Sequence, residues 1–344
     1  MFGGYFMDNV IDALKIKRYV EENYEIDVKT VEKVKNSYKI ITNDEGYCLK
    51  IIKYEFSHFY FIYSAMKHLQ RNGFSDVPQF ILNKHGKEYG IIDKRYVYLT
   101  KWIPSRVSNY DNPIELSMVS TELAKLHNCS KGFVVNKDMK PRIGWFSWEK
   151  VFNTRKNEML DFKERINRKA YKTEFDLLYL DNIEREIKRA EKSIDGLRKN
   201  NYINVMEKEV FKSGFCHHDY AHHNILVDNA WKLNIIDFDY CILDSHLHDL
   251  SSLLIRSMKD GKWDSRKANL IFYSYEKIGS VEKYELPIMR EFMRFPQAFW
   301  QIGIQAYWEM QPWGEEFFIN KLKKYLSDSD EREEFIDSYF KGGD

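Results

Sequence analysis

Residues 215–239 read FCHHDYAHHNILVDNAWKLNIIDFD, and the fold assignment starts from this stretch. It contains Asp219, then Asn224 five residues later and Asp237 thirteen residues after that. Two short apolar runs lie between Asn224 and Asp237, and the polar segment 228–232 separates them, which is typical of a β-hairpin. Because a hairpin folds the chain back on itself, we expect Asn224 at its entrance to lie close to Asp237 at its exit.

Three oxygen-bearing side chains would then converge at one end of a rigid element. Phosphoryl transfer needs such an arrangement, because one carboxylate orients the attacking hydroxyl while a carboxylate and an amide hold Mg²⁺ on the nucleotide phosphates. Mg²⁺ prefers oxygen ligands and keeps several waters, so two protein ligands are enough. The alternative is an ordinary hairpin that is approached by a polar loop.

The motif His218-Asp219-x-x-x-x-Asn224, followed by Ile236-Asp237-Phe238-Asp239, resembles the catalytic and metal-binding loops of aminoglycoside phosphotransferases and choline kinases, a branch of the protein kinase-like superfamily. The longer segments HHDYAHHNILVD and IIDFDYCILDSHLHDLSSL are still more similar to the CotS-type spore-coat proteins of that branch. The resemblance implies an α+β, protein kinase-like bilobal fold, with a small antiparallel β-sheet lobe and a mainly helical lobe. ATP and Mg²⁺ would bind in the cleft between the lobes.

The resemblance also implies a role for each residue of the motif. Asp219 would be the catalytic base, and Asn224 and Asp237 would hold Mg²⁺. Asp239 stands where protein kinases have glycine, so its carboxylate would either bind a further metal ion or cap the next segment.

Two further residues would support the catalytic loop. His218 would brace it by hydrogen bonds, and Asp249 matches the buried aspartate that ties this loop to the following helix in the family. The chain has no long activation segment ending in Ala-Pro-Glu. This favours the small-molecule branch over a phosphorylation-switched protein kinase.

In the N-terminal third, Lys50 matches the strand lysine that pairs with the nucleotide phosphates in this fold. A solvent-facing lysine is the alternative. The segment 101–105 is the expected hinge, where Trp102 and Ile103 would lie against the adenine ring through backbone groups. The alternative for Trp102 is core packing. The implied division is residues 1–101 for the nucleotide-binding lobe, 102–106 for the hinge and 107–344 for the helical lobe.

The sequence departs from the family pattern at two places. The loop 35–38 contains no glycine, so its backbone would approach phosphates less closely than a glycine-rich loop does. The predicted helix 57–72 has no carboxylate at residues 61–64, where the partner of the strand lysine is expected, and Glu55 lies before the helix. Because that ion pair positions the lysine, a catalytically inactive kinase-fold component of the spore coat is a second hypothesis.

Hydrophobic periodicity and turn residues predict the remaining elements. Helices are expected at 9–22, 57–72, 113–129, 250–258, 267–277, 286–310 and 315–326, with two charged helical segments between 150 and 199. Small-lobe strands are expected at 28–34, 38–42, 47–53, 77–82, 88–93 and 95–100.

The composition limits the possible functions. The 344 residues exceed the usual size of one domain, and a net charge of +1 gives no indication of a nucleic-acid partner. Four scattered cysteines fit reduced thiols. The chain shows neither a signal-peptide pattern nor an apolar run of transmembrane length. We therefore expect synthesis in the cytoplasm and no membrane partner, and the resemblance adds the spore coat as a location.

Histidine density and aromatic clustering offer rival interpretations. His217, His218, His222, His223, His246 and His248 suggest a transition-metal hydrolase, although no helical i, i+4 pair aims two imidazoles at one ion. Trp300, Tyr307, Trp308 and Trp313 could form a cation–π cage for a choline-type acceptor, or pack in the core.

The hypothesis that we carry forward is an ATP- and Mg²⁺-dependent phosphotransferase. Its partners would be a nucleotide, a small hydroxylated acceptor such as a sugar or an amino alcohol, and other spore-coat proteins.

Overall fold

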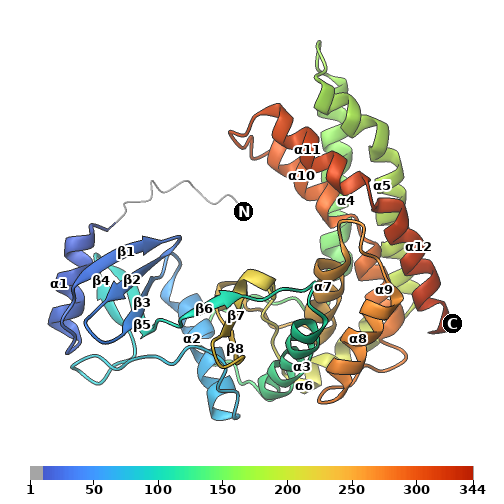
Figure 1. Ribbon diagram of the computed structural model, residues 1–344. Helices are drawn as coiled ribbons and strands as arrows, with labels where there is room; N and C mark the ends of the chain where they lie inside the picture. The colour runs from blue at the N-terminus through green and yellow to red at the C-terminus, as the bar shows by residue number, and fades with distance from the viewer. Residues whose placement is uncertain (1–10, 344) are drawn as a thin grey trace.

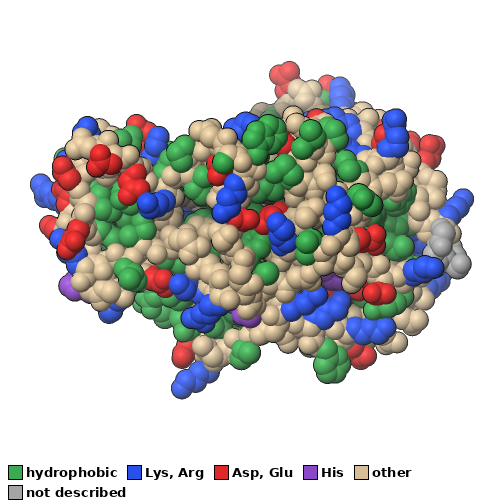
Figure 2. All heavy atoms as spheres, turned by 60° about the horizontal axis from the view of Figure 1, so that its bottom comes forward, with side chains coloured by type: hydrophobic (Ala, Val, Ile, Leu, Met, Phe, Trp, Pro, Cys, Tyr) green, Lys and Arg blue, Asp and Glu red, His purple; other side chains and the backbone are tan. Residues whose placement is uncertain are grey.

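The computed structural model describes residues 11–343, which form a small lobe and a larger helical lobe (Figure 1). This is the α+β, two-lobe architecture that the sequence predicted. On the face shown in Figure 2, acidic and basic side chains are intermixed over both lobes. No helix among residues 11–343 combines the length and the apolarity that a membrane span requires. The four cysteines are unpaired, as predicted.

The small lobe is built on a five-stranded antiparallel sheet with the strand order β1-β2-β3-β5-β4. One helix packs on this sheet, and its residues Ile16 and Val20 are fully buried against Ile40, Leu49 and Val97. The elements are α1 (Ala13–Asn23), β1 (Thr30–Val34), β2 (Ser37–Ile41), β3 (Gly46–Ile51), β4 (Gly90–Ile92) and β5 (Arg95–Lys101).

Helix α2 (Phe56–Arg71) follows β3 in the chain, but its buried side chains belong to the core of the helical lobe. Phe61, Ile62 and Leu69 lie in that core, where α2 contacts α3 (Pro113–Ser130). The helix therefore fixes the small lobe to the large one by burial of apolar surface, which is the dominant favourable term in such contacts.

A second, three-stranded antiparallel sheet contains the predicted hairpin. Its strands are β6 (Ser105–Val107), β7 (Ile225–Asp228) and β8 (Leu233–Ile235), in the order β6-β7-β8. Val227 pairs with both Arg106 and Leu233. Since β6 directly follows Pro104, this sheet joins the chain that leaves the small lobe to the β7–β8 hairpin.

The rest of the large lobe is helical. In Figure 1, α4 and α5 rise beside α10 and α11 as an arm at the upper right, while α7 lies between α3 and α9. The helices are α4 (Trp148–Asn167), α5 (Glu174–Lys199), α6 (Tyr202–Lys212), α7 (His246–Met258), α8 (Ser265–Glu276), α9 (Leu286–Arg294), α10 (Gln297–Tyr307), α11 (Glu315–Leu326) and α12 (Ser329–Tyr339), with short 3-10 turns η1 (His222–Asn224), η2 (Phe238–Tyr240) and η3 (Phe340–Gly343).

Most predicted elements are confirmed within a few residues, including the hairpin and the paired charged helices between 150 and 199. The predicted helix 9–22 begins outside the described residues. Its described part starts at Ala13, because the Asp12 side chain accepts a hydrogen bond from the backbone N–H of Leu14. This is the usual N-cap interaction.

Other predictions were wrong. Residues 77–82 form no strand, and only Phe80 bridges to Thr100, because Val77 and Phe80 instead fill the core of the large lobe. The predicted helix 286–310 is two helices, since Phe295 is extended before Pro296. A residue before proline is pushed out of the helical region. Helices α6 and α12 and strand β6 were not predicted.

The arm depends on one close approach. Gly303 of α10 is buried, and a methyl group there would meet the hydroxyl of Tyr179 on α5 and the ring of Phe162 on α4. We predict that Gly303→Ala lowers the free energy of unfolding by about 1–3 kcal/mol, the usual cost of overpacking. Gly314→Ala is the matched control, because nothing lies within 4 Å of the added carbon. Urea denaturation curves of both variants would check this, and equal midpoints would contradict it.

Candidate active site

The catalytic loop between Phe215 and Asn224 is anchored at both ends. Cys216 pairs with Ile242 through two backbone hydrogen bonds of 2.8 and 3.1 Å. At the other end Tyr220 is fully buried, and its hydroxyl donates to the carbonyl of Val119 at 2.9 Å. Asp219, which lies between Cys216 and Tyr220, is therefore carried by a fixed backbone.

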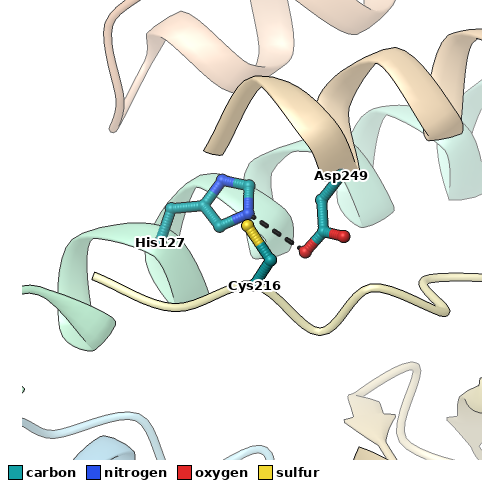
Figure 3. A group of neighbouring side chains, drawn as sticks. All are labelled: His127, Cys216 and Asp249. Carbon is teal, nitrogen blue, oxygen red and sulfur yellow. Dashed lines mark hydrogen bonds and ion pairs between the residues drawn. The ribbon is translucent and has the colours of Figure 1, made fainter. Parts of the chain in front are cut away.

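Asp249 of α7 forms the central brace of this loop. Its carboxylate accepts the backbone N–H groups of His217 at 2.7 Å and His218 at 2.8 Å. His127 Nε2 lies 3.3 Å from the same carboxylate, beside the thiol of Cys216 (Figure 3). Burial alone would raise the pKa of Asp249, but the hydrogen bond from His127 and the charges of His127 and His248 hold that pKa well below its usual range.

The brace therefore uses the backbone of His218, not its imidazole. The His218 ring stacks on the ring of His248 with centroids 4.3 Å apart. Its backbone has φ of 69°, in the left-handed region that costs a non-glycine residue energy. The hydrogen bond to Asp249 compensates for that strain.

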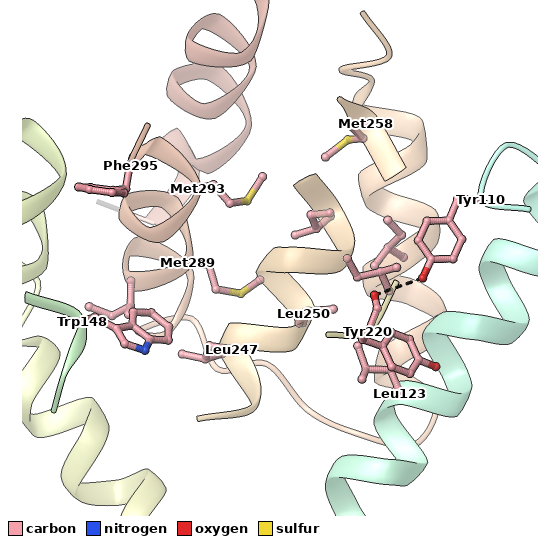
Figure 4. Packing of buried hydrophobic residues seen from close by; sticks show 14 of the residues in the cluster. Tyr110, Leu123, Trp148, Tyr220, Leu247, Leu250, Met258, Met289, Met293 and Phe295 are labelled. Carbon is pink, nitrogen blue, oxygen red and sulfur yellow. Dashed lines mark hydrogen bonds between the residues drawn. The ribbon is translucent and has the colours of Figure 1, made fainter. Parts of the chain in front are cut away.

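Helix α7 is in turn held by apolar packing on two sides. Figure 4 shows Leu247 and Leu250 of α7 between the methionines of α9 and Leu123 of α3. All three leucines are fully buried. In the same view the hydroxyl of Tyr110 donates to the carbonyl of Tyr220 at 3.3 Å, which ties the loop to the same core.

Both oxygens of the Asp219 carboxylate have a partner. Asn224 Nδ2 donates to Asp219 Oδ2 and to its backbone carbonyl, each at 2.9 Å. A guanidinium nitrogen of Arg256 lies 2.8 Å from Asp219 Oδ1. Sequence reasoning missed Arg256, which lies seven residues beyond Asp249 on α7 and so returns to the same face of that helix.

The hairpin returns the chain to this loop. The backbone N–H of Ile236 donates to the carbonyl of Asn224 at 2.9 Å, and His217 Nε2 lies 2.9 Å from the carbonyl of Ile236. Asp237 follows directly, with φ of 65° in the left-handed region. The hairpin thus places Asp237 next to Asn224, as expected.

Lys50 of β3 crosses from the small lobe to two carboxylates of the large lobe. Its Nζ lies 2.7 Å from Asp237 Oδ1 and 2.7 Å from Asp239 Oδ1. Burial alone would lower the pKa of Lys50, but Tyr98, Asp239 and Asp237 raise it well above its usual value. Burial would likewise raise the pKa of Asp237, which Lys50 instead lowers.

These contacts explain how Lys50 is neutralised although α2 carries no carboxylate. Asp239 occupies the position of a second counterion, and the hydroxyl of Tyr54 donates to its Oδ1 at 3.0 Å. On α2 itself, Lys67 pairs with Glu88 at 2.7 Å, and Tyr63 bonds the same carboxylate. That helix therefore contributes no acid to Lys50.

The turn before Lys50 is short. Lys35 and Asn36 alone connect β1 to β2, and Lys35 has φ of 50° where a glycine would be unstrained. Ser37 pairs with Lys50 across the sheet, so this turn lies beside the lysine.

In the hinge, the backbone N–H of Trp102 donates to the carbonyl of Gly46 at 2.8 Å. A methyl group on Gly46 would lie 3.0 Å from Trp102 Cβ, so the glycine lets the hinge pack closely on β3. The Trp102 ring is half-buried under Lys39, whose Nζ is 5.0 Å from its centroid. The carbonyl of Ile103 accepts from the hydroxyl of Ser105 at 2.9 Å.

The donor set suits a hard divalent cation. The amide NH₂ of Asn224 is used by Asp219, so its amide oxygen is the atom of this side chain left to bind a cation. The carboxylate of Asp237 is 42% exposed despite its contact with Lys50. An amide oxygen and a carboxylate are the two protein ligands that Mg²⁺ needs on a nucleotide.

The histidines do not assemble into one metal site. His217 and His218 are tied to the hairpin and to His248, while His222 and His223 stand in the exposed turn η1. His246 lies apart from them, in a buried ionic cluster at the start of α7. The transition-metal hydrolase interpretation therefore finds no support in this part of the chain.

That ionic cluster consists of His246, Glu209, Glu285 and Lys212. His246 Nδ1 lies 2.7 Å from Glu209 Oε2, and its Nε2 lies 3.6 Å from Glu285. Lys212 pairs with Glu209 and lies 3.7 Å from Glu285. The three acid and imidazole ligands are close enough to hold a metal ion. Two cations already balance the two carboxylates, so the cluster is a salt-bridge network.

Burial alone would lower the pKa of His246, but the two glutamates raise it to about 9. A raised pKa stabilises the fold fully below the unfolded value near 6.5, and the contribution disappears as pH rises through about 9. We predict that the free energy of unfolding falls over this range by up to about 3 kcal/mol more in the wild type than in His246→Gln. Denaturation at pH 6 and pH 9.5 would test this, and parallel pH profiles of the two proteins would contradict it.

Solved structures share this architecture along nearly the whole chain. An aminoglycoside phosphotransferase from Alicyclobacillus acidocaldarius subsp. acidocaldarius DSM 446 superposes with a TM-score of 0.83 at 21% identity, covering 95% of this chain and 96% of that one. Spectinomycin phosphotransferase APH(9)-Ia, solved with ADP and spectinomycin, gives 0.69 at 15% identity over 96% and 99%. The amicoumacin kinase hAmiN, solved with AMP-PNP, Ca²⁺ and Ami, gives 0.65 at 14% identity over 93% and 94%.

The molecule therefore has the bilobal, protein kinase-like fold that aminoglycoside phosphotransferases and choline kinases share. Within that class the match is specific. The chain belongs to the family described as "Spore coat putative kinase YutH", whose model matches residues 17–339. Both the superfamily and the spore-coat group predicted from the sequence are confirmed, and the family's description associates its members with the spore coat.

Proposed function

We propose that this protein is an ATP- and Mg²⁺-dependent phosphotransferase that acts on a hydroxyl group of a small molecule. The observation that carries the proposal is the convergence of Asp219, Asn224, Asp237 and Lys50 within a chain of contacts of 2.7–2.9 Å. The nucleotide-bound complexes of structures with the same fold support the nucleotide, and the Ca²⁺ of one of them supports a divalent cation.

In this proposal Mg²⁺·ATP supplies the phosphoryl group and the charge neutralisation, and the protein's side chains position the reacting groups. Asp219 orients the acceptor hydroxyl and takes its proton on one of its carboxylate oxygens. Asn224 and Asp237 hold the cation through oxygen atoms. Lys50 stays charged and leaves Asp237 to contact the phosphates, while Asp239 keeps it in place.

We assign Asp239 first to Lys50, although a metal ligand was predicted there. Its Oδ1 accepts hydrogen bonds from Lys50 and Tyr54, so it replaces the carboxylate that α2 lacks. Trp102 and Ile103 remain our candidates for the adenine site, where backbone groups of the hinge would bind the base. His218 and Asp249 would fix the loop that carries Asp219.

The lobe limits follow the same proposal. Residues 1–101 would bind the nucleotide, 102–106 would act as the hinge, and 107–344 would carry the catalytic and metal-binding loops. The family's association with the spore coat supports activity in that layer, beside other coat proteins, after synthesis in the cytoplasm.

Asp219→Asn tests the chemistry. We predict that the variant binds ATP with Mg²⁺ as the wild type does but releases ADP at least about a hundredfold more slowly, because a general base typically contributes that much. Asp181→Asn on the exposed side of α5 is the control with the same chemical change. Titration calorimetry and an ADP-release assay over a panel of hydroxylated metabolites would measure both. Absence of ATP binding by the wild type would reject the kinase and leave a coat component without turnover.

A comparison of two aspartates tests the metal assignment. Asp237→Asn should raise the half-saturating Mg²⁺ concentration for ATP binding by roughly tenfold or more, because it removes a direct ligand of the cation. Asp239→Asn should leave that concentration unchanged and lower turnover, because it loosens Lys50. A raised Mg²⁺ requirement in Asp239→Asn would instead return Asp239 to the metal site.

A further inference from the structure

The acceptor of the proposed reaction must approach a guanidinium group. Its hydroxyl has to reach Asp219, and Arg256 lies 2.8 Å from Asp219 Oδ1. The Arg256 side chain is 35% exposed, so a small molecule can reach it while it contacts the aspartate. Whatever reacts at Asp219 is therefore in reach of an arginine fork.

Two more arginines act on the same loop from other elements. Arg142 precedes α4 and is exposed, with its guanidinium 5.2 Å from the ring of Tyr240. Arg155 of α4 is partly buried. Burial first, and then the positive charges of His248, Arg142 and Arg155, lower the pKa of His218 to about 3. His218 immediately precedes Asp219, so positive potential reaches the loop from several sides.

Within residues 11–343, neither Arg142 nor Arg155 has a carboxylate in ion-pair contact. Arg155 donates to the amide oxygen of Gln297 at 2.6 Å and covers the ring of Trp300 at 4.4 Å. Burial lowers the pKa of Arg155 to about 10, against the raising effect of Glu158. Glu158 is itself bonded by the indole N–H of Trp300. A desolvated guanidinium of this kind gains from an added anion.

The acids of the site are already neutralised. Asp219 is paired with Arg256, while Asp237 and Asp239 share Lys50. A cationic acceptor would therefore compete with the chain's own cations for each of these carboxylates.

The predicted aromatic cage offers a cationic acceptor no alternative site. The four residues predicted as a choline-type cage each have a ring face covered by a cation of the protein itself. The pairs are Arg155 over Trp300 at 4.4 Å, Lys169 over Tyr307 at 5.2 Å, Arg165 over Trp308 at 6.0 Å and Lys321 over Trp313 at 5.6 Å. Cations of the protein thus occupy the cage, and these cation–π contacts hold the arm together.

We propose that the acceptor is an anionic alcohol, a small molecule that carries a carboxylate or phosphate group besides its hydroxyl, and that Arg256 selects it. The proposal rests on the function proposed above. A guanidinium binds either anion through two parallel hydrogen bonds, so both belong to one class. Arg142 and Arg155 add positive potential to the loop that carries Asp219.

The same contact connects recognition to chemistry. When the acceptor's anion takes Arg256, Asp219 Oδ1 is released to accept the hydroxyl proton. The hydroxyl oxygen then forms a bond to the γ-phosphorus as the bond to the leaving ADP breaks, and the proton leaves on Asp219. A neutral or cationic alcohol provides no anion for Arg256 and leaves Asp219 paired.

Matched acceptors test this directly. One set is glycerate, glycerol 3-phosphate, glycerol and 3-amino-1,2-propanediol, and a second is glucuronate, glucose 6-phosphate, glucose and glucosamine. With Mg²⁺·ATP we expect kcat/KM for an anionic member to exceed that of its neutral and cationic counterparts by at least roughly tenfold, and by less at high salt. Comparison of the carboxylate members with the phosphate members identifies which anion the protein prefers.

Variants connect the preference to the residue. Arg256→Gln should raise the KM of the preferred anion by roughly tenfold to a hundredfold and bring the anionic-to-neutral ratio towards one. Arg155→Gln should reduce the ratio less. Arg266→Gln, an exposed arginine that pairs with Asp264, should change nothing.

Three results would overturn the proposal. These are preference for a neutral or cationic member, an unchanged ratio in Arg256→Gln, or ATP binding without phosphorylation of any member of either set. Failure to bind ATP would reject the underlying phosphotransferase instead, so the two failures are distinguishable.

Discussion

A buried ammonium group joins the two lobes. Lys50 is only 9% exposed, and a charge withdrawn from water is tolerated in a protein only with close counterions and hydrogen bonds. In this chain both counterions, Asp237 and Asp239, come from the opposite lobe. The lobes must therefore meet at one place for the lysine to be satisfied, and that place is beside Asp237 and Asp239. The missing acid on α2 does not leave Lys50 unpaired, because the Asp-Phe-Asp motif supplies two carboxylates two residues apart.

The second constraint is the position of a short loop. The Asp249 carboxylate accepts hydrogen bonds from two successive backbone N–H groups. The path of the loop is therefore fixed independently of the side chains of His217 and His218. The salt-bridge network of His246 fixes the start of the same helix, and its far end carries Arg256 to Asp219. One helix thus both holds the catalytic loop and adds the cation beside its aspartate. The loop, Asp249 and Arg256 therefore cannot move separately.

The arm of α4, α5, α10 and α11 shows how similar folds can serve different acceptors. Its aromatic residues are consumed by internal cation–π contacts, and Gly303 allows the helices to approach closely enough to make them. A shared fold therefore does not by itself determine the acceptor. In our proposal the charges around Asp219 select the acceptor, because function depends on the site grafted on a fold.

The sequence alone determined the hairpin, the order of Asp219, Asn224 and Asp237, and the class of fold, because these residues lie within one stretch and a two-strand ribbon brings them together whatever surrounds it. It also located Lys50 and Asp249 by resemblance. Only the tertiary structure decided what Lys50 pairs with, that His218 braces through its backbone, and that Arg256 reaches Asp219. Those contacts join residues from separate elements, where local pattern carries no information about distance. The same holds for β6, since an exposed segment takes its form from the strand with which it pairs.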